Sequence, residues 1–100
     1  MYIVFLKFGE NKAQAKDFMS GHNAWINDGF SAGHFAMTGS VLPNSGGAIL
    51  VRDMDRALLD ALLLEDPFVA ENVVIPEIVE VRPGKWDDQL AFLVEADTSI

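Results

Sequence analysis

Residues 33–52 read GHFAMTGSVLPNSGGAILVR, two strand-like segments on either side of a turn. The segments 33–41 and 48–52 have the character of short strands, and residues 43–47 (PNSGG) have the composition of a turn. Two strands joined by one short turn run antiparallel. The stretch therefore predicts an antiparallel strand pair in the middle of the chain.

Side chains alternate between the two faces of a strand. In the first strand of this pair, one face is expected to carry Phe35, Met37 and Gly39, and the other His34, Ala36, Thr38 and Ser40. The second set places the hydroxyl groups of Thr38 and Ser40 on a common face.

Before this pair, the chain offers a strand and then a helix. Residues 2–8 (YIVFLKF) are β-branched and aromatic, which predicts a strand. Residues 13–28 carry apolar side chains at steps of three and four, which predicts a helix with His22 on its inner stripe. Gly29 is placed to end that helix.

After the pair, the sequence predicts a second helix and a last strand. Asp53 is expected to cap a helix that continues to Leu64. The inner stripe of this helix is expected to hold Ala57, Leu58, Ala61 and Leu62. Residues 73–81 predict the last strand, bent or placed at a sheet edge because Pro76 cannot donate a ladder hydrogen bond.

The predicted order of elements is β-α-β-β-α-β. That order is the ferredoxin-like arrangement of the α+β class, in which an antiparallel sheet carries two helices on one face. Residues 1–84 are expected to form this domain. Residues 85–100 make a C-terminal extension with apolar side chains such as Trp86 and Phe92, expected to pack on the domain or on a partner subunit.

The first strand offers apolar side chains on both of its faces. Tyr2, Val4 and Leu6 occupy one face, and Ile3 and Phe5 the other. A sheet that is apolar on both faces predicts that a partner covers the second one. A 100-residue domain also has much surface for its volume. We therefore expect a homodimer.

The composition excludes several classes of function. The formal net charge is −8 with only 7 Lys and Arg residues, so neither nucleic acid nor an anionic membrane surface is an expected partner. The chain has no cysteine, which excludes thiol catalysis, disulfides and cysteine-ligated metals. No secretory signal is visible, and no apolar run approaches the about 20 residues that span a bilayer. We expect a cytoplasmic protein.

Neither a metal nor an organic cofactor is expected. His22 and His34 match no metal-binding spacing. No glycine-rich loop joins a strand to a helix at the spacing of a phosphate-binding site.

The strongest candidate site combines His22 with Asp66. Helical spacing aims His22 inward, where an imidazole needs a polar partner, because an unpaired buried polar group costs about 1–3 kcal/mol. Asp66 follows the second helix, and a carboxylate beside a histidine is a common way to build a general acid or base. Two plainer interpretations stay open: His22 is a core histidine bound to a backbone carbonyl, and Asp66 caps the next turn.

These residues resemble a known family, the YCII-related (YciI-like) proteins. The resemblance covers residues 1 to about 83. It rests on the element order and on four features: Tyr2-Ile3-Val4, His22, Thr38-Gly39 and Asp66-Pro67-Phe68. It implies a dimeric α/β-barrel and a pocket with a His–Asp pair proposed as catalytic. It also implies relatives that remove chloride from chlorinated hydroxyquinones. This chain has Ser40 where the family usually has proline.

Two functions follow as hypotheses. The first is a cofactor-free enzyme that isomerises, or eliminates a group such as chloride from, a small aromatic or unsaturated carbonyl compound. His22 would move the proton, Asp66 would fix its tautomer, and Ser40 and Thr38 would bind the substrate. The second is a non-catalytic dimeric module that binds a small molecule or serves another protein.

Overall fold

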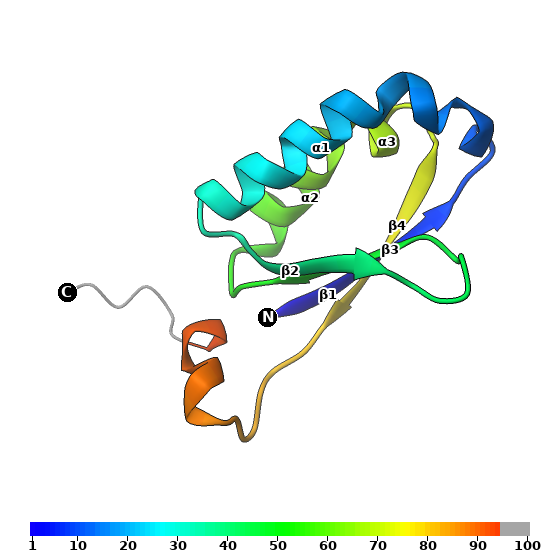
Figure 1. Cartoon of the computed structure of the whole chain (residues 1–100). Coiled ribbons are helices and arrows are strands. Elements are labelled where there is room, and N and C mark those ends of the chain that lie inside the picture. The colour runs from blue at the N-terminus through cyan, green and yellow to red at the C-terminus, as the bar shows by residue number, and fades with distance from the viewer. Residues whose placement is uncertain (95–100) are drawn as a thin grey trace.

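Four antiparallel strands form one sheet in the order β2-β3-β1-β4, and the α-helices gather on one of its faces (Figure 1). The computed structural model describes residues 1–94. The strands are β1 (Tyr2–Phe8), β2 (Phe35–Ser40), β3 (Gly47–Val51) and β4 (Val74–Glu80). The helices are η1 (Lys12–Gln14), α1 (Ala15–Ser31), α2 (Arg56–Leu64), α3 (Pro67–Ala70) and η2 (Asp88–Leu93). The predicted α+β, ferredoxin-like fold is confirmed.

The first strand, β1, lies inside the sheet and builds its hydrophobic core. It pairs with β3 on one side and with β4 on the other, so that Val4 lies opposite both Ile49 and Ile78. Tyr2, Val4 and Leu6 are buried beneath the helices. The strand β4 stands at the sheet edge, as Pro76 predicted, because a proline there costs no ladder hydrogen bond.

A β-bulge in β2 changes the expected alternation of its faces. Phe35 lies opposite Val51, whereas Met37 lies opposite the neighbouring Leu50. The extra residue moves Phe35 to the helix-covered face, where it is buried, and leaves Met37 55% exposed on the other face. The expectation that Phe35, Met37 and Gly39 share a face was therefore wrong at Phe35. Thr38 lies opposite the buried Ile49, on the face that the helices cover.

Gly29 has a different role from the predicted one. The helix α1 continues past it to Ser31, and the turn that follows contains Gly33 at a positive φ of 80°. A Cβ atom on Gly29 would overlap the ring of Phe35. The glycine therefore lets the Phe35 ring pack directly against the helix, and the chain leaves the helix only at Gly33.

The start and the buried side of α2 also differ from the sequence prediction. Asp55, not Asp53, is the N-cap, and its carboxylate accepts a hydrogen bond from the Ala57 N–H at 3.4 Å. The buried leucines are Leu59 and Leu63, whereas Leu58 is exposed. Ala57 and Ala61 of the predicted stripe are exposed as well, whereas Leu62 is partly buried against the core, as predicted.

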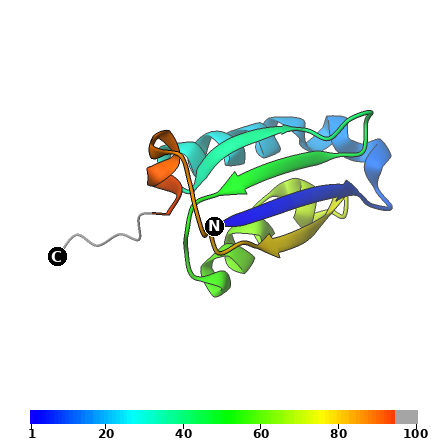
Figure 2. The ribbon, with the colours of Figure 1, turned by 90° about the horizontal axis from the view of Figure 1, so that it is seen from below.

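The second face of the sheet, here called the outer face, is largely apolar. Side chains on it alternate with the buried ones of β1, and Ile3 lies opposite both Leu50 and Val79. The apolar members of the outer face are Ile3, Phe5, Met37, Ala48, Leu50, Ile75 and Val79. The helices α1, α2 and α3 lie on the opposite face, and Figure 2 shows the outer face turned toward the viewer, with η2 beside the end of the sheet.

Beyond β4 the chain crosses the end of the sheet at which β1 begins. It then forms η2 near the start of β2 (Figure 2). Leu93 is buried, and the Arg52 Nε–H donates to the Phe92 carbonyl at 3.2 Å. The described part of the extension thus packs on its own domain. No helix among residues 1–94 has the length and apolar character needed to cross a membrane.

Candidate functional site

Asp66 is placed by the turn that it caps. Pro67 begins α3, a position where its missing N–H is not needed. The Asp66 Oδ1 atom accepts the Phe68 N–H at 2.9 Å. The carboxylate is completely buried, with 0% of the residue exposed. The predicted capping role of Asp66 is thus present, and it fixes the direction of the side chain.

His22 reaches this carboxylate from the middle of α1, which packs against α3. Its Nδ1 atom lies 2.9 Å from Asp66 Oδ1, within hydrogen-bond range. The preceding Gly21 allows the approach, because a Cβ atom there would lie 2.9 Å from Pro67 Cγ. The helix and the Asp-Pro turn therefore meet at a residue with no side chain.

The imidazole is also held by an aromatic ring. The ring centroids of His22 and Phe68 are 3.9 Å apart, and their planes differ by 5°. Trp25 lies one turn further along α1, with its ring centroid 6.1 Å from that of His22. Hydrogen bonding and stacking together fix both the position and the plane of the imidazole.

The two nitrogen atoms of His22 have different surroundings. Nδ1 faces Asp66, while no described residue forms a hydrogen bond with Nε2. The His22 side chain keeps 12% of its surface exposed. A neutral imidazole that donates from Nδ1 carries its lone pair on Nε2, so the arrangement favours Nε2 as the atom that accepts a proton.

The second carboxylate oxygen of Asp66 has no hydrogen-bond partner among residues 1–94. Oδ2 is buried and forms no hydrogen bond with the described residues, while Oδ1 receives both the imidazole and the Phe68 N–H. A buried oxygen without a donor costs free energy relative to its hydration in water. The carboxylate therefore depends strongly on His22, its only side-chain partner among residues 1–94.

Thr38 and Ser40, the predicted substrate-binding residues, lie on the edge strand β2. Neither side chain forms a hydrogen bond with His22 or Asp66 in the described part of the chain. The helix α3 contacts β4, at the opposite edge of the sheet. The structure thus brings His22 and Asp66 together, and a ligand-binding role for the two hydroxyls stays a prediction.

Two contributors to the site were not predicted as such. The stacking of Phe68 and the contact at Gly21 depend on how two helices meet, which helical spacing alone does not specify. A sequence signal does exist for Gly21, since a glycine inside a helix often marks a close approach. Trp25 is buried and donates its indole N–H to the Leu62 carbonyl at 2.9 Å.

Tyr2 carries the one clear pKa shift among the described groups. Burial raises the pKa of its hydroxyl, and the negative charges of Glu80 and Asp53 raise it further. The hydroxyl donates to the Met54 carbonyl at 2.9 Å. Tyr2 therefore stays protonated and serves to hold the start of α2 against β1.

No group of three or more potential metal ligands occurs among residues 1–94.

Comparison with known proteins supports the fold. No protein-family model and no curated protein sequence matches the chain. One similar solved structure is the 5-chloro-2-hydroxyhydroquinone dehydrochlorinase TftG from Burkholderia phenoliruptrix AC1100, in complex with 2,5-dihydroxybenzoquinone. The TM-score is 0.67, and the match covers 84% of this chain and 96% of TftG. At 11% identity the likeness establishes a common fold.

Proposed function

We propose that this protein is a cofactor-free enzyme that moves a proton on a small aromatic or unsaturated carbonyl compound. The observation that carries the proposal is the His22–Asp66 pair. The carboxylate is fully buried, Nδ1 lies 2.9 Å from it, and Nε2 has no hydrogen-bond partner among the described residues. That combination suits a general base whose tautomer is fixed.

In the proposed reaction, Nε2 of His22 takes a proton from a carbon or hydroxyl of the substrate. The electron pair of the broken bond moves into the conjugated system, and negative charge develops on the carbonyl oxygen. Asp66 stabilises the imidazolium that forms. The proton then returns to another atom of the substrate, which gives an isomer. Alternatively, the electron pair expels a leaving group such as chloride, and the imidazolium releases its proton to water.

The developing charge needs a donor close to the substrate oxygen. Thr38 lies on the helix-covered face of β2, and Ser40 follows two residues later on the same strand. We assign these hydroxyls to the substrate oxygen, because donors aimed at developing charge lower the barrier of such reactions.

The substrate class has support from two sides. The resemblance to the YCII-related proteins includes relatives that act on chlorinated hydroxyquinones. TftG, which shares the fold, is a dehydrochlorinase and was solved with a dihydroxybenzoquinone. A hydroxyquinone offers both an acidic proton and conjugated carbonyls, the two features that a lone acid–base pair requires.

We further propose a homodimer in which two outer faces pack against each other, as in a dimeric α/β-barrel. The outer face presents a contiguous apolar surface around Ile3 and Leu50 that the described helices leave uncovered. Covering such a surface is the usual way to remove it from water.

A cysteine-free chain also suits the reducing cytoplasm, where we place the protein.

A second candidate function is small-molecule binding without catalysis. The observation that favours it is a cavity of about 680 Å³ at the end of the sheet, which neither His22 nor Asp66 lines. A binding module would recognise its ligand there and use the His–Asp pair only to join α1 to α3.

Turnover separates the two candidates. We would incubate the protein with a panel of chlorinated and unchlorinated hydroxyhydroquinones and cyclic enones, following chloride release and absorbance. His22→Asn and Asp66→Asn are expected to lose turnover by at least about a hundredfold. His34→Asn is the matched control, because it changes the other histidine in the same way and is expected to keep full activity.

Equal turnover by His22→Asn and the unmodified protein would contradict the proposed role of the pair. Thermal stabilisation by a panel compound without any product would favour the binding module instead.

A further inference from the structure

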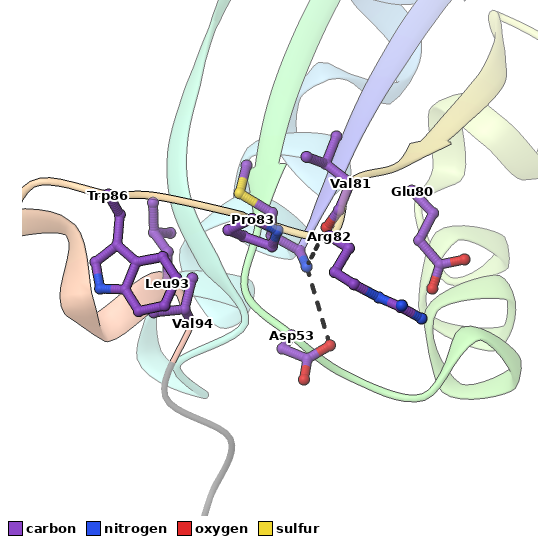
Figure 3. Close-up of a pocket in the computed structure, with 9 residues that line it drawn as sticks. Asp53, Glu80, Val81, Arg82, Pro83, Trp86, Leu93 and Val94 are labelled. Atoms are coloured by element: carbon purple, nitrogen blue, oxygen red, sulfur yellow. Dashed lines mark hydrogen bonds and ion pairs between the residues drawn. The ribbon is translucent and has the colours of Figure 1, made fainter.

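A cavity of about 680 Å³ lies between the chain that follows β4 and the end of η2 (Figure 3). It is separate from the His22–Asp66 pair, since neither residue lines it. Cavities that bind small molecules have volumes of about 300–1,000 Å³. The size is therefore suited to a small organic ligand.

One side of the cavity is apolar. Trp86, Leu93 and Val94 lie together on this side, as Figure 3 shows. Leu93 is buried, whereas Trp86 keeps 49% of its surface exposed although it belongs to the cavity wall. An indole that is half-covered by its own chain offers a flat surface on which an apolar ring can pack.

The other side of the cavity carries charged groups, and the cation that matters is Arg82. Within residues 1–94, no carboxylate lies within ion-pair distance of its guanidinium, and no side-chain hydrogen bond involves it. Asp53 behaves differently, because it lies 3.9 Å from the Met1 amino group. That amino group also donates to the Val81 carbonyl at 3.1 Å. The guanidinium N–H groups of Arg82 thus line the cavity without a side-chain partner among residues 1–94.

These two walls specify the chemistry of a ligand. A guanidinium binds a carboxylate through two parallel hydrogen bonds. Glu80 and Asp53 line the same cavity, and their negative charges disfavour a ligand of high charge such as a polyphosphate. An anion with a single charge and an apolar body satisfies both sides.

We propose that this cavity is a binding site for a small aryl or arylalkyl monocarboxylate. The carboxylate binds Arg82, and the ring packs between Trp86 and Leu93. The site depends on the C-terminal extension, which supplies the apolar wall. It is independent of the proposed reaction at His22.

The test uses the full chain and two probes of nearly equal shape, phenylacetate and its neutral amide, phenylacetamide. Backbone and indole N–H resonances are followed by NMR during titration to millimolar concentration. Phenylacetate is expected to shift the Trp86 indole signal and the backbone signals of Arg82 and Leu93. Phenylacetamide is expected to bind at least about tenfold more weakly, because a neutral amide does not match two guanidinium donors.

Variants locate the charge that is responsible. Arg82→Gln is expected to weaken phenylacetate binding at least about tenfold. Arg56→Gln is the matched control, since Arg56 pairs with Asp60 on α2 and does not line the cavity. This variant changes the net charge equally and is expected to leave the affinity unchanged.

Three results would overturn the proposal. One is equal binding of phenylacetate and phenylacetamide, and another is an affinity that Arg82→Gln leaves unchanged. The third is a shift of the Trp86, Arg82 and Leu93 resonances with protein concentration and not with either probe. A second copy of the chain would then occupy the cavity.

Discussion

The ring of Phe68 lies nearly parallel to the imidazole of His22, with the ring centroids 3.9 Å apart. The backbone N–H of Phe68 donates a hydrogen bond to Asp66 Oδ1. One residue thus contacts both members of the pair, the histidine through its side chain and the aspartate through its backbone. Phe68 is for this reason a positioning residue of the proposed reaction. Changing its side chain alters the stacking on His22 and leaves the backbone hydrogen bond to Asp66 in place.

Phe68→Leu removes the stacking and keeps the backbone hydrogen bond. We expect turnover to fall by about tenfold to a hundredfold, because a small displacement of the reacting nitrogen is sufficient for such a loss. The cost in stability should be about 1–2 kcal/mol, since leucine keeps the position apolar but fills less of the space that the ring occupies. Steady-state kinetics and urea unfolding measure the two effects. Phe68→Tyr keeps the ring stacked and should keep activity; equal losses in both variants would argue against stacking.

Removing His22 should destabilise the protein through Asp66. In His22→Ala the buried carboxylate keeps a single hydrogen bond from the Phe68 N–H. Urea unfolding of His22→Ala, Asp66→Asn and the double variant gives the coupling free energy between the two residues. We expect about 1–3 kcal/mol, because they are in direct contact and buried. Strictly additive effects would show that the two side chains do not support each other in solution.

Gly29→Ala should be unusually harmful for a helical position, where alanine normally stabilises. The new Cβ atom would overlap the Phe35 ring, and relieving that overlap should cost about 1–3 kcal/mol. Thermal unfolding measures the loss. Gly84→Ala is the control, because nothing lies within 4 Å of a Cβ atom at that position. A Gly29→Ala protein as stable as the control would show that Phe35 moves aside freely.

Placing a charge on the outer face should dissociate the proposed dimer. Leu50→Glu introduces a carboxylate opposite Ile3, where packing against a second sheet would bury it without a partner. Light scattering is expected to give twice the chain mass of 11.0 kDa for the unmodified protein and the single mass for the variant. Leu58→Glu, on the exposed side of α2, should leave the dimer intact. A monomeric unmodified protein at micromolar concentration would refute the dimer.

Stability should decrease at alkaline pH through Tyr2. Burial raises the pKa of its hydroxyl in the folded state above the ordinary value of 10.0. The unfolded chain therefore loses this proton first, so the contribution to stability is complete below about pH 10 and is lost as the pH rises toward the folded-state pKa. Because the chain has 1 tyrosine, its absorbance titration reports Tyr2 alone. Tyr2→Phe should remove this part of the alkaline loss, and a midpoint at the ordinary value would contradict the prediction.

The order of elements and the two members of the His22–Asp66 pair follow from local patterns in the sequence. Changes of period from two to 3.6 along the chain are a local property, so they predict the four strands and the two main helices. The Asp-Pro step is equally local, because a proline begins a helix well and an aspartate caps it. A histidine on the inner stripe of α1 then needed a partner, which Asp66 provides.

Other details depend on contact between distant segments, which no local pattern specifies. The bulge that turns Phe35 into the core and the overlap that requires Gly29 both arise where β2 meets α1. The N-cap of α2 depends on another distant contact: Asp53 and Asp55 are the same residue type, but the carbonyl of Met54 between them accepts the Tyr2 hydroxyl, and the helix begins only after Asp55. Whether a residue is buried depends on which surfaces of the folded chain meet. A periodic pattern identifies the apolar face of a helix or strand, but not the element that packs against that face.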